Sequence, residues 1–171
     1  NHASKLGIHL TLFTQETEND FLLNNGTLGP ERKLYYRELV SRFGHNLGVT
    51  WELGEENDNW SGHVKNFGKY LKQLDPYSHE VSIHPWPQDI DSPGIYDPLL
   101  GYLFHDGANF QITDYHLGNS AAMDKIYDRV KTWRDLSSAA GRPWEITLDE
   151  LGPAAEGVKP DSIDPDHDMQ R

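Results

Sequence analysis

The sequence predicts an α/β fold with a parallel sheet, and more specifically five βα units of a (β/α)8 barrel, its strands 3 to 7. Predicted strands and helices alternate along the chain, which is typical of parallel βαβ units. Polar residues follow every predicted strand, whereas an open sheet concentrates its site at one crevice, and no Gly-rich phosphate fingerprint is present. Five strands are too few to close the barrel. We therefore expect residues 1–171 to form one domain that is an internal fragment of a larger polypeptide.

The composition narrows the classes of ligand. With 15 basic and 27 acidic side chains the formal net charge is −12, which disfavours nucleic acid and anionic membrane surfaces as partners. Five Trp and eight Tyr among many polar residues suit a neutral, polyhydroxylated ligand, so a carbohydrate is the expected substrate. The absence of cysteine excludes disulfides, thiolate zinc sites and cysteine nucleophiles.

The central strand is predicted from the alternation of Val49, Trp51 and Leu53. Gly54 allows a sharp turn where this strand ends, and the adjacent carboxylates of Glu55 and Glu56 follow it. Active sites of parallel α/β folds lie at the carboxyl ends of strands, so this stretch is the candidate chemical site. The alternative interpretation is a solvated acidic loop whose carboxylates pair with nearby Lys or Arg.

Four more strands are predicted from period-two patterns over residues 6–12, 81–83, 110–112 and 144–148. The first runs into an acidic loop over residues 14–20. The polar or aromatic residues that follow the other three are His84 and Trp86, Tyr115 and His116, and Asp149 and Glu150. Each predicted strand therefore delivers candidate site residues to the same edge of the sheet.

Three helices are predicted from apolar residues spaced three and four apart. The first begins at Pro30 and stops at Gly44, the second is capped by Ser61 and ends before Asp75, and the third is capped by Ser120. A short helix is expected from Pro98. The apolar faces are Tyr36, Leu39, Val40 and Phe43; Val64, Phe67, Leu71 and Leu74; and Met123, Ile126, Tyr127, Val130 and Trp133.

Two motifs resemble those of retaining (β/α)8 glycoside hydrolases of the family 5 and family 2-like type. Trp51-Glu52-Leu53-Gly54-Glu55-Glu56-Asn57 resembles their fourth-strand motif, in which Asn-Glu ends the strand and the Glu is the acid/base. Ile146-Thr147-Leu148-Asp149-Glu150-Leu151-Gly152 is similar to their seventh-strand motif, in which the Glu is the nucleophile. The chain as a whole resembles the glycoside hydrolase-like barrels of large bacterial proteins with a collagen-binding-like terminal domain.

The resemblance implies that Glu56 is the acid/base and Glu150 the nucleophile of a secreted polysaccharide-degrading enzyme, extracellular or periplasmic. Glu55 stands where these enzymes usually have an Asn that binds the sugar 2-hydroxyl, and Tyr115 lies where an aromatic residue often contacts the nucleophile. The expected substrate-binding residues are Glu55, Asn57, Tyr115, His116, His84 and Trp86.

The chemistry of the two carboxyl groups supports this interpretation independently. Glycoside hydrolysis needs one carboxylic acid to protonate the leaving oxygen and one carboxylate to attack the anomeric carbon or activate water. We expect the neighbouring carboxylates to keep Glu56 protonated near neutrality. The alternative function is a catalytically inactive carbohydrate-binding or scaffold barrel, which the Glu at position 55 favours.

No cofactor and no metal are expected. His9, His84 and His116 lie on separate predicted strands and lack a local zinc spacing, so a metal-dependent hydrolase ranks third. Asp164, Asp166 and Asp168 alternate like the start of a calcium loop but lack its Gly and distal Glu, so a solvated acidic tail is expected there.

Overall fold

The computed structural model describes residues 2–55, 63–84, 107–112 and 126–151. For residues 107–112, 126, 129 and 148–151 it describes the backbone alone. No helix among these residues is long and apolar enough to cross a membrane.

A five-stranded parallel sheet organises the chain, and its strands neighbour one another in sequence order. The strands are β1 (Leu10–Phe13), β2 (Val49–Glu52), β3 (Glu80–Ile83), β4 (Gly107–Ile112) and β5 (Glu145–Leu151). The α-helices are α1 (His2–Lys5), α2 (Pro30–Phe43), α3 (His63–Leu74) and α6 (Ile126–Ala139), and two 3-10 turns are η1 (Thr17–Asn19) and η2 (Asn24–Gly26). The predicted α/β class with parallel strands is confirmed.

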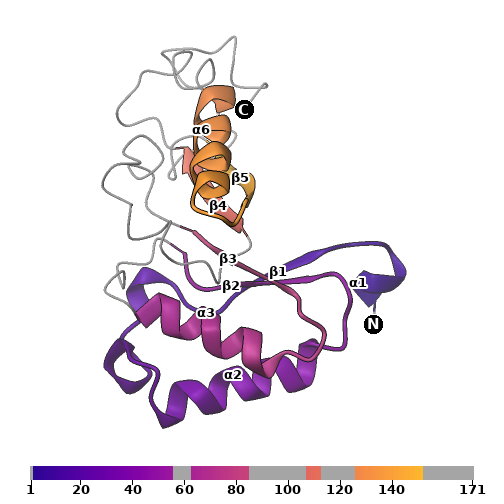
Figure 1. The fold of residues 1–171 in the computed structure, drawn as a ribbon. Coiled ribbons are helices and arrows are strands. Elements are labelled where there is room, and N and C mark those ends of the chain that lie inside the picture. The colour runs from indigo at the N-terminus through magenta and orange to yellow at the C-terminus, as the bar shows by residue number, and fades with distance from the viewer. Residues whose placement is uncertain (1, 56–62, 85–106, 113–125, 152–171) are drawn as a thin grey trace, which may run out of the picture.

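The helices that connect the strands cover one side of β1, β2 and β3. Helices α2 and α3 lie next to each other beneath these strands, and α6 lies along β5 (Figure 1). As predicted, Pro30 occupies the first turn of α2, and Gly44 caps its end with an N–H that donates to the carbonyl of Val40. Helix α3 ends at Leu74, directly before Asp75-Pro76 as predicted.

Between the sheet and these helices lies the apolar core. Val49, Trp51 and Leu53 are at most 2% exposed, which confirms the alternation predicted for the central strand. The predicted faces of α2 and α3 meet them through Tyr36 and Phe67, whose rings make an edge contact at 5.8 Å. The other buried members are Val64, Leu71, Val81, Ile83, Trp133 and Trp144. Trp133 of α6 stacks on Trp144 at 6.2 Å, just before β5.

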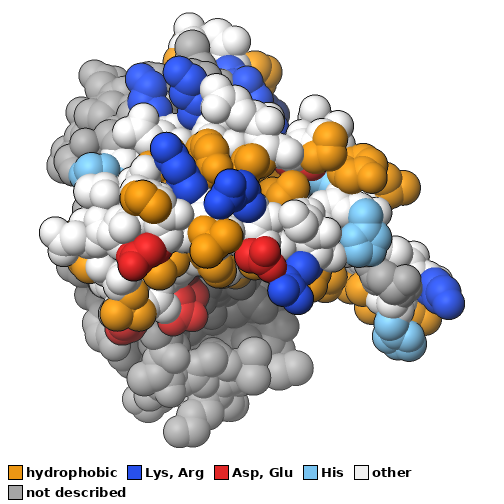
Figure 2. Space-filling model, turned by 90° about the horizontal axis from the view of Figure 1, so that it is seen from below, with side chains coloured by type: hydrophobic (Ala, Val, Ile, Leu, Met, Phe, Trp, Pro, Cys, Tyr) orange, Lys and Arg blue, Asp and Glu red, His pale blue; other side chains and the backbone are white. Residues whose placement is uncertain are grey.

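Seen from the side of α2 and α3, the surface mixes charges of both signs with scattered hydrophobic side chains (Figure 2). Phe43, expected on the apolar face of α2, is 41% exposed, and Tyr127 of α6 is 72% exposed. Both lie at helix ends, where the apolar stripe has rotated away from the sheet. These two core predictions are therefore wrong.

The strand boundaries also differ from the prediction at three places. Strand β4 begins at Gly107, three residues before the predicted start at residue 110. Leu6 and Ile8 are 60% and 48% exposed and precede β1, because residues 2–5 form a helical turn and Gly7 takes a φ of 70°. At the other end, Asp149 and Glu150 lie inside β5 rather than after it. Ser61, Ser120, Met123 and the helix expected from Pro98 lie outside the described residues.

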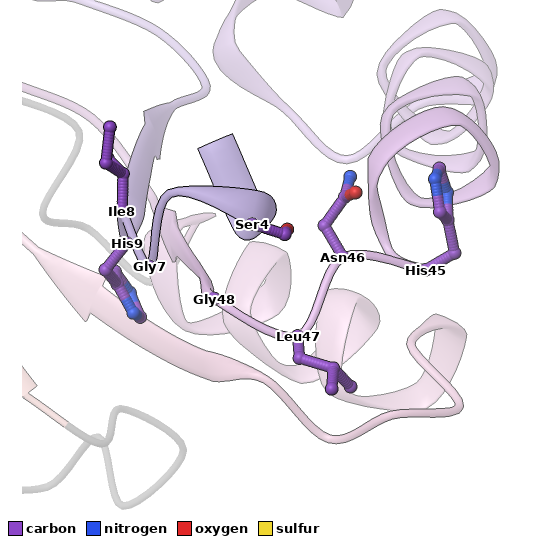
Figure 3. Close-up of a pocket in the computed structure, with 8 residues that line it drawn as sticks. All are labelled: Ser4, Gly7, Ile8, His9, His45, Asn46, Leu47 and Gly48. Atoms are coloured by element: carbon purple, nitrogen blue, oxygen red, sulfur yellow. The ribbon is translucent and has the colours of Figure 1, made fainter. Parts of the chain in front are cut away.

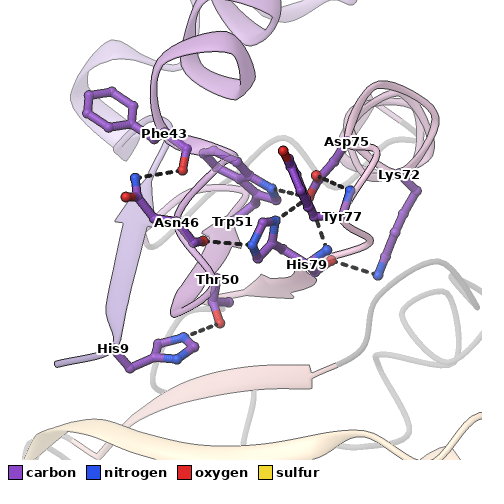
Figure 4. A network of polar contacts seen from close by, with 9 residues as sticks. All are labelled: His9, Phe43, Asn46, Thr50, Trp51, Lys72, Asp75, Tyr77 and His79. Atoms are coloured by element: carbon purple, nitrogen blue, oxygen red, sulfur yellow. Dashed lines mark hydrogen bonds and ion pairs between the residues drawn. The ribbon is translucent and has the colours of Figure 1, made fainter. Parts of the chain in front are cut away.

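A buried polar network at the turn between α3 and β3 anchors the central strand (Figure 4). The Asp75 carboxylate accepts hydrogen bonds from the Trp51 indole at 2.9 Å, from the backbone N–H of Tyr77 at 2.9 Å and from that of His79 at 3.0 Å. Burial by itself raises the pKa of Asp75, but these hydrogen bonds outweigh it and hold the pKa below its ordinary value. The carboxylate is therefore ionised in the folded protein.

His79 completes this network with both ring nitrogens. Its Nδ1 lies 2.7 Å from Oδ2 of Asp75, and its Nε2 lies 2.8 Å from the carbonyl oxygen of Asn46. Both ring nitrogens therefore lie at hydrogen-bonding distance from an oxygen atom. The pair ties the loop before β2 to the turn before β3, and the Lys72 ammonium adds a hydrogen bond to the His79 carbonyl at 2.9 Å.

We predict that Asp75→Asn lowers the free energy of unfolding at neutral pH by about 3 kcal/mol, because an amide N–H₂ group then replaces a buried carboxylate oxygen that accepts hydrogen bonds from Trp51 and from the backbone. Because the folded-state pKa of Asp75 lies below its ordinary 3.8, its stabilising effect is present above that pH and is lost as the pH falls through the folded value. Urea denaturation at several pH values measures both effects.

The matched control is Asp135→Asn, which removes an exposed partner of Lys131 on α6. It should change stability little. An Asp75→Asn protein as stable as the parent at neutral pH would contradict the anchoring role of the Asp75 carboxylate.

Candidate functional site

Backbone hydrogen bonds join the segments that follow the carboxyl ends of β1 and β2. Glu16 and Glu55 form an isolated parallel bridge beyond the two strands, and the N–H of Glu55 donates to the carbonyl of Gln15 at 3.1 Å. The Thr17 hydroxyl donates to the carbonyl of Glu55 at 3.3 Å. Gly54 makes this possible with a φ of 154°, as the sequence predicted for a turn at this position. The acidic loop after β1 therefore lies against the acidic motif after β2.

The face of the sheet opposite the helices is polar and buried. Since Val49, Trp51 and Leu53 face the helices, the alternate residues Thr50 and Glu52 lie on the other face. Glu52 is fully buried at the end of β2, and its Oε2 accepts a hydrogen bond from the hydroxyl of Ser82 on β3. Towards the amino end of the same face, Nε2 of His9 lies 2.9 Å from the Thr50 hydroxyl.

Glu52 and Ser82 are site residues that the sequence analysis did not single out. Glu52 lies in the segment that resembles the fourth-strand motif. The prediction of this strand used only its alternating apolar residues, Val49, Trp51 and Leu53, and not the residues between them. The signal was present, because a carboxylate in a strand with buried neighbours must itself be buried on the opposite face.

His84 extends this face beyond the end of β3. Its side chain is 2% exposed, and its ring lies 5.9 Å from that of Phe13 on β1 at an interplanar angle of 57°. Strand β2 lies between the strands that carry these two rings, so side chains from β1 and β3 meet across its carboxyl end. His84 was predicted as a site residue, and the structure places it at the carboxyl edge.

Glu150 follows an irregularity in β5. Phe110 of β4 pairs with Leu148, but the next residue, Gln111, pairs with Glu150, so Asp149 is an extra residue in the ladder. Such a bulge resets the alternation of the strand, and bulges are frequent beside active sites because they re-aim a side chain. The sequence motif gave no sign of this bulge.

A pocket of about 440 Å³ opens at the carboxyl end of β1, between the following loop and the first turns of α2. Its lining includes Phe13, Gln15, Glu16, Asn19, Leu22, Arg32 and Tyr35. None of these residues was individually predicted as catalytic or substrate-binding, although Gln15, Glu16 and Asn19 belong to the loop expected to carry polar residues after the first strand. The pocket itself joins three separate elements whose proximity no local pattern reveals.

Arg32 holds the wall of this pocket together. Its side chain is 1% exposed, and its guanidinium donates to the side-chain oxygen of Gln15, to the carbonyl of Asp20 at 2.5 Å and to that of Leu23 at 3.4 Å. The guanidinium also lies 4.6 Å from the centre of the Phe67 ring, a cation–π contact. One buried cation therefore joins the loop over residues 15–23 to α2 and α3.

Two tyrosines next to Arg32 stay protonated under ordinary conditions. Burial raises the pKa of Tyr36 to about 12, although the positive charge of Arg32 opposes the shift. Burial raises the pKa of Tyr35 as well. Their hydroxyl groups are therefore hydrogen-bonding groups here and not bases.

A second pocket, of about 490 Å³, lies at the opposite edge of the sheet. It is lined by Ser4 of α1, by residues 7–9 before β1 and by residues 45–48 before β2, and Ser4 and Asn46 face each other across it (Figure 3). Both strands begin at this edge. Parallel α/β folds build active sites where strands end, so this pocket is not the candidate site despite its larger volume.

Of the predicted catalytic and substrate-binding residues, two have described side chains. Glu55 and His84 lie at the carboxyl ends of the adjacent strands β2 and β3. The backbone of Glu150 lies in β5, and the other predicted residues, Glu56, Asn57, Trp86, Tyr115 and His116, lie outside the described residues. The tail with Asp164, Asp166 and Asp168 lies outside them too.

Among the described residues, no three His, Cys, Asp or Glu side chains gather closely enough to hold a metal ion. Neither the comparison with protein-family models nor that with curated proteins finds a match to this chain. The functional argument therefore depends on the chain's own residues and their arrangement.

We predict that Arg32→Lys loosens the loop over residues 15–23, because an ammonium group lacks the planar fork that reaches Gln15 and two carbonyls together. The loss should be about 2 kcal/mol of local stability. Hydrogen–deuterium exchange of peptides from this loop measures it. Arg37→Lys, at an exposed position of the same helix, is the matched control and should leave exchange unchanged. Equal exchange in the two variants would refute the anchoring role.

Proposed function

We propose that the chain forms part of the (β/α)8 barrel of a retaining glycoside hydrolase, with Glu56 as acid/base and Glu150 as nucleophile. One observation carries the proposal. Glu150 lies in β5, and Glu56 comes four residues after the end of β2 in the sequence; β2 and β5 are parallel members of one sheet and lie three positions apart in its order. In an eight-strand barrel, strands at that separation face each other across the mouth, where glycosidases need two carboxyl groups.

The strand order supports a barrel over an open doubly wound sheet. A doubly wound sheet reverses direction at a switch point, whereas these five strands follow one another in sequence without reversal. The buried polar face of the sheet also supports a barrel. Thr50, Glu52, Ser82 and His84 are at most 5% exposed and lie on the face away from α2 and α3, which would be the interior of a closed barrel.

The proposed reaction has two displacements. The Glu150 carboxylate attacks the anomeric carbon as the glycosidic C–O bond breaks, and Glu56 gives its proton to the leaving oxygen. Glu56 then removes a proton from water, whose oxygen attacks the same carbon and releases Glu150. For this mechanism the carboxyl groups should lie about 5 to 5.5 Å apart, whereas about 6.5 to 9.5 Å would suit inversion.

The bulge at Asp149 gives this assignment additional support. It separates Glu150 from the regular alternation of β5 at the position where the motif places the nucleophile. At β2, the bridge between Glu16 and Glu55 holds the residue before Glu56 against the neighbouring loop. Backbone bonds therefore restrain Glu55, which precedes Glu56 in the sequence, and Glu150 itself.

The second candidate is a carbohydrate-binding barrel without turnover. The Glu at position 55 favours it, because a carboxylate replaces the Asn amide that would donate a hydrogen bond to the sugar 2-hydroxyl. A half-buried Glu55 whose backbone is bonded to Gln15 and Thr17 has limited freedom to move away. Turnover separates the two candidates.

We predict that the protein carrying this chain hydrolyses at least one substrate in a panel of aryl β- and α-glycosides of neutral sugars. Glu56→Gln and Glu150→Gln should each lower kcat by on the order of a thousandfold, because each removes one of the two groups that the reaction needs. Steady-state kinetics measures the loss.

Glu38→Gln, at an exposed ion pair of α2, is the control and should retain full activity. Retention of configuration in the first product, followed by NMR, distinguishes the retaining from the inverting mechanism. Binding of sugars without any turnover would support the second candidate instead.

A further inference from the structure

We propose that the 440 Å³ pocket at the carboxyl end of β1 is a binding site for a sugar unit of the substrate, separate from the position where the bond is cleaved. This proposal rests on the proposed function for the identity of the substrate. It names a new site, because its residues lie on β1, on the loop after β1 and on α2, away from the two glutamates in the chain.

The first argument is location. Gln15 and Glu16 line the pocket, and the same two residues bond to Glu55 through the 3.1 Å hydrogen bond and the parallel bridge. Glu55 directly precedes the proposed acid/base. The loop that lines the pocket is therefore bonded to the residue that precedes Glu56 in the sequence.

The second argument is the chemistry of the lining. Apolar surface comes from Phe13, which is 39% exposed, and from Leu22, which is 77% exposed. Amide and carboxylate groups come from Asn19 and Glu16. Flat apolar surface next to hydrogen-bonding groups matches a pyranose ring, which has apolar C–H faces and a rim of hydroxyl groups. The volume lies within the usual range of small-molecule sites.

The third argument selects a neutral ligand over an anionic one. Among the described residues that line the pocket, Arg32 is the one cation, and its Nη1 and Nη2 groups already donate to Gln15, Asp20 and Leu23. At 1% exposure it offers no free charge to a phosphate, sulfate or uronate. The Glu16 carboxylate would repel such a group, so the site suits an uncharged sugar.

The fourth argument is rigidity. Arg32 holds the loop over residues 15–23 in place, so the pocket is already formed in the absence of ligand. Binding therefore costs little conformational entropy for ordering this loop. The N–H of Glu16 also donates to the side-chain oxygen of Asn19 at 3.0 Å, which orients the amide at the pocket wall.

The absence of cysteine in the chain allows a direct test. Leu22→Cys places one thiol at the pocket, and Leu47→Cys places one at the amino-end pocket with a similar exposure of 82%. Both are made in the protein carrying this chain, with Glu56→Gln added to prevent consumption of the ligand. The rate of alkylation by iodoacetamide is followed by peptide mass spectrometry, with and without neutral β-gluco-, manno-, xylo- and galacto-oligosaccharides of one to six units.

We expect a saturating oligosaccharide of three or more units to slow alkylation of Leu22→Cys about tenfold, while the monosaccharide and the Leu47→Cys control show no change. In the parent protein, Phe13→Ala should raise KM for the same oligosaccharide about tenfold, and Phe13→Tyr, which keeps the ring, should restore it.

The outcomes separate this proposal from the proposed function. Hydrolysis of an oligosaccharide that leaves Leu22→Cys unprotected would overturn the sugar site and leave the hydrolase standing. Protection of Leu22→Cys without hydrolysis by the parent protein would support the sugar site and overturn the hydrolase. If no sugar is hydrolysed and none protects the thiol, both proposals fail.

Discussion

The arrangement of the first three strands depends on the hydrogen bonds that the buried carboxylate of Asp75 accepts. This carboxylate accepts hydrogen bonds from the Trp51 indole, from two backbone N–H groups and from the His79 ring, and His79 passes the connection on to the carbonyl of Asn46. The network thus fixes the start of β2, its central side chain and the turn before β3 relative to one another. A buried carboxylate is costly unless its oxygens accept hydrogen bonds, and here the Trp51 indole and the neighbouring backbone N–H groups supply the donors.

Because this network fixes which side of β2 faces the helices, it also fixes which residues lie on the other side. Trp51 is committed to the helices, so Glu52 lies opposite, buried beside Ser82. The candidate site is built on that second face and on the edge above it. Arg32 has a comparable structural role outside the sheet, because its guanidinium binds Gln15 and Asp20 and so determines the path of the loop after β1. The arrangement of the candidate site thus depends on two buried charged groups, the Asp75 carboxylate and the Arg32 guanidinium.

Most of the fold followed from local patterns. Alternating apolar residues correctly predicted β2, β3 and β4, and the Pro30 and Gly44 signals correctly bounded α2. The prediction failed where apolar residues alternate without a partner to bury them. Leu6 and Ile8 satisfy the strand pattern but precede the strand, because the chain there forms a helical turn and Gly7 takes a left-handed conformation. The spacing of apolar residues shows which side chains a segment could bury. Whether they are buried depends on the elements that pack against the segment in the folded structure.

The sequence by itself determined the α/β class, the parallel strands and the delivery of Glu55 and His84 to strand ends, because these follow from periodicity and turn residues within a few positions of each other. Tertiary structure alone decided the buried pairing of Glu52 with Ser82, the contact of His79 with Asp75 and Asn46, the bulge at Asp149 and the pocket around Arg32. Each of these joins residues from different elements. Their distances depend on strand register and helix packing, which the free energy of the whole fold selects and which no local pattern encodes.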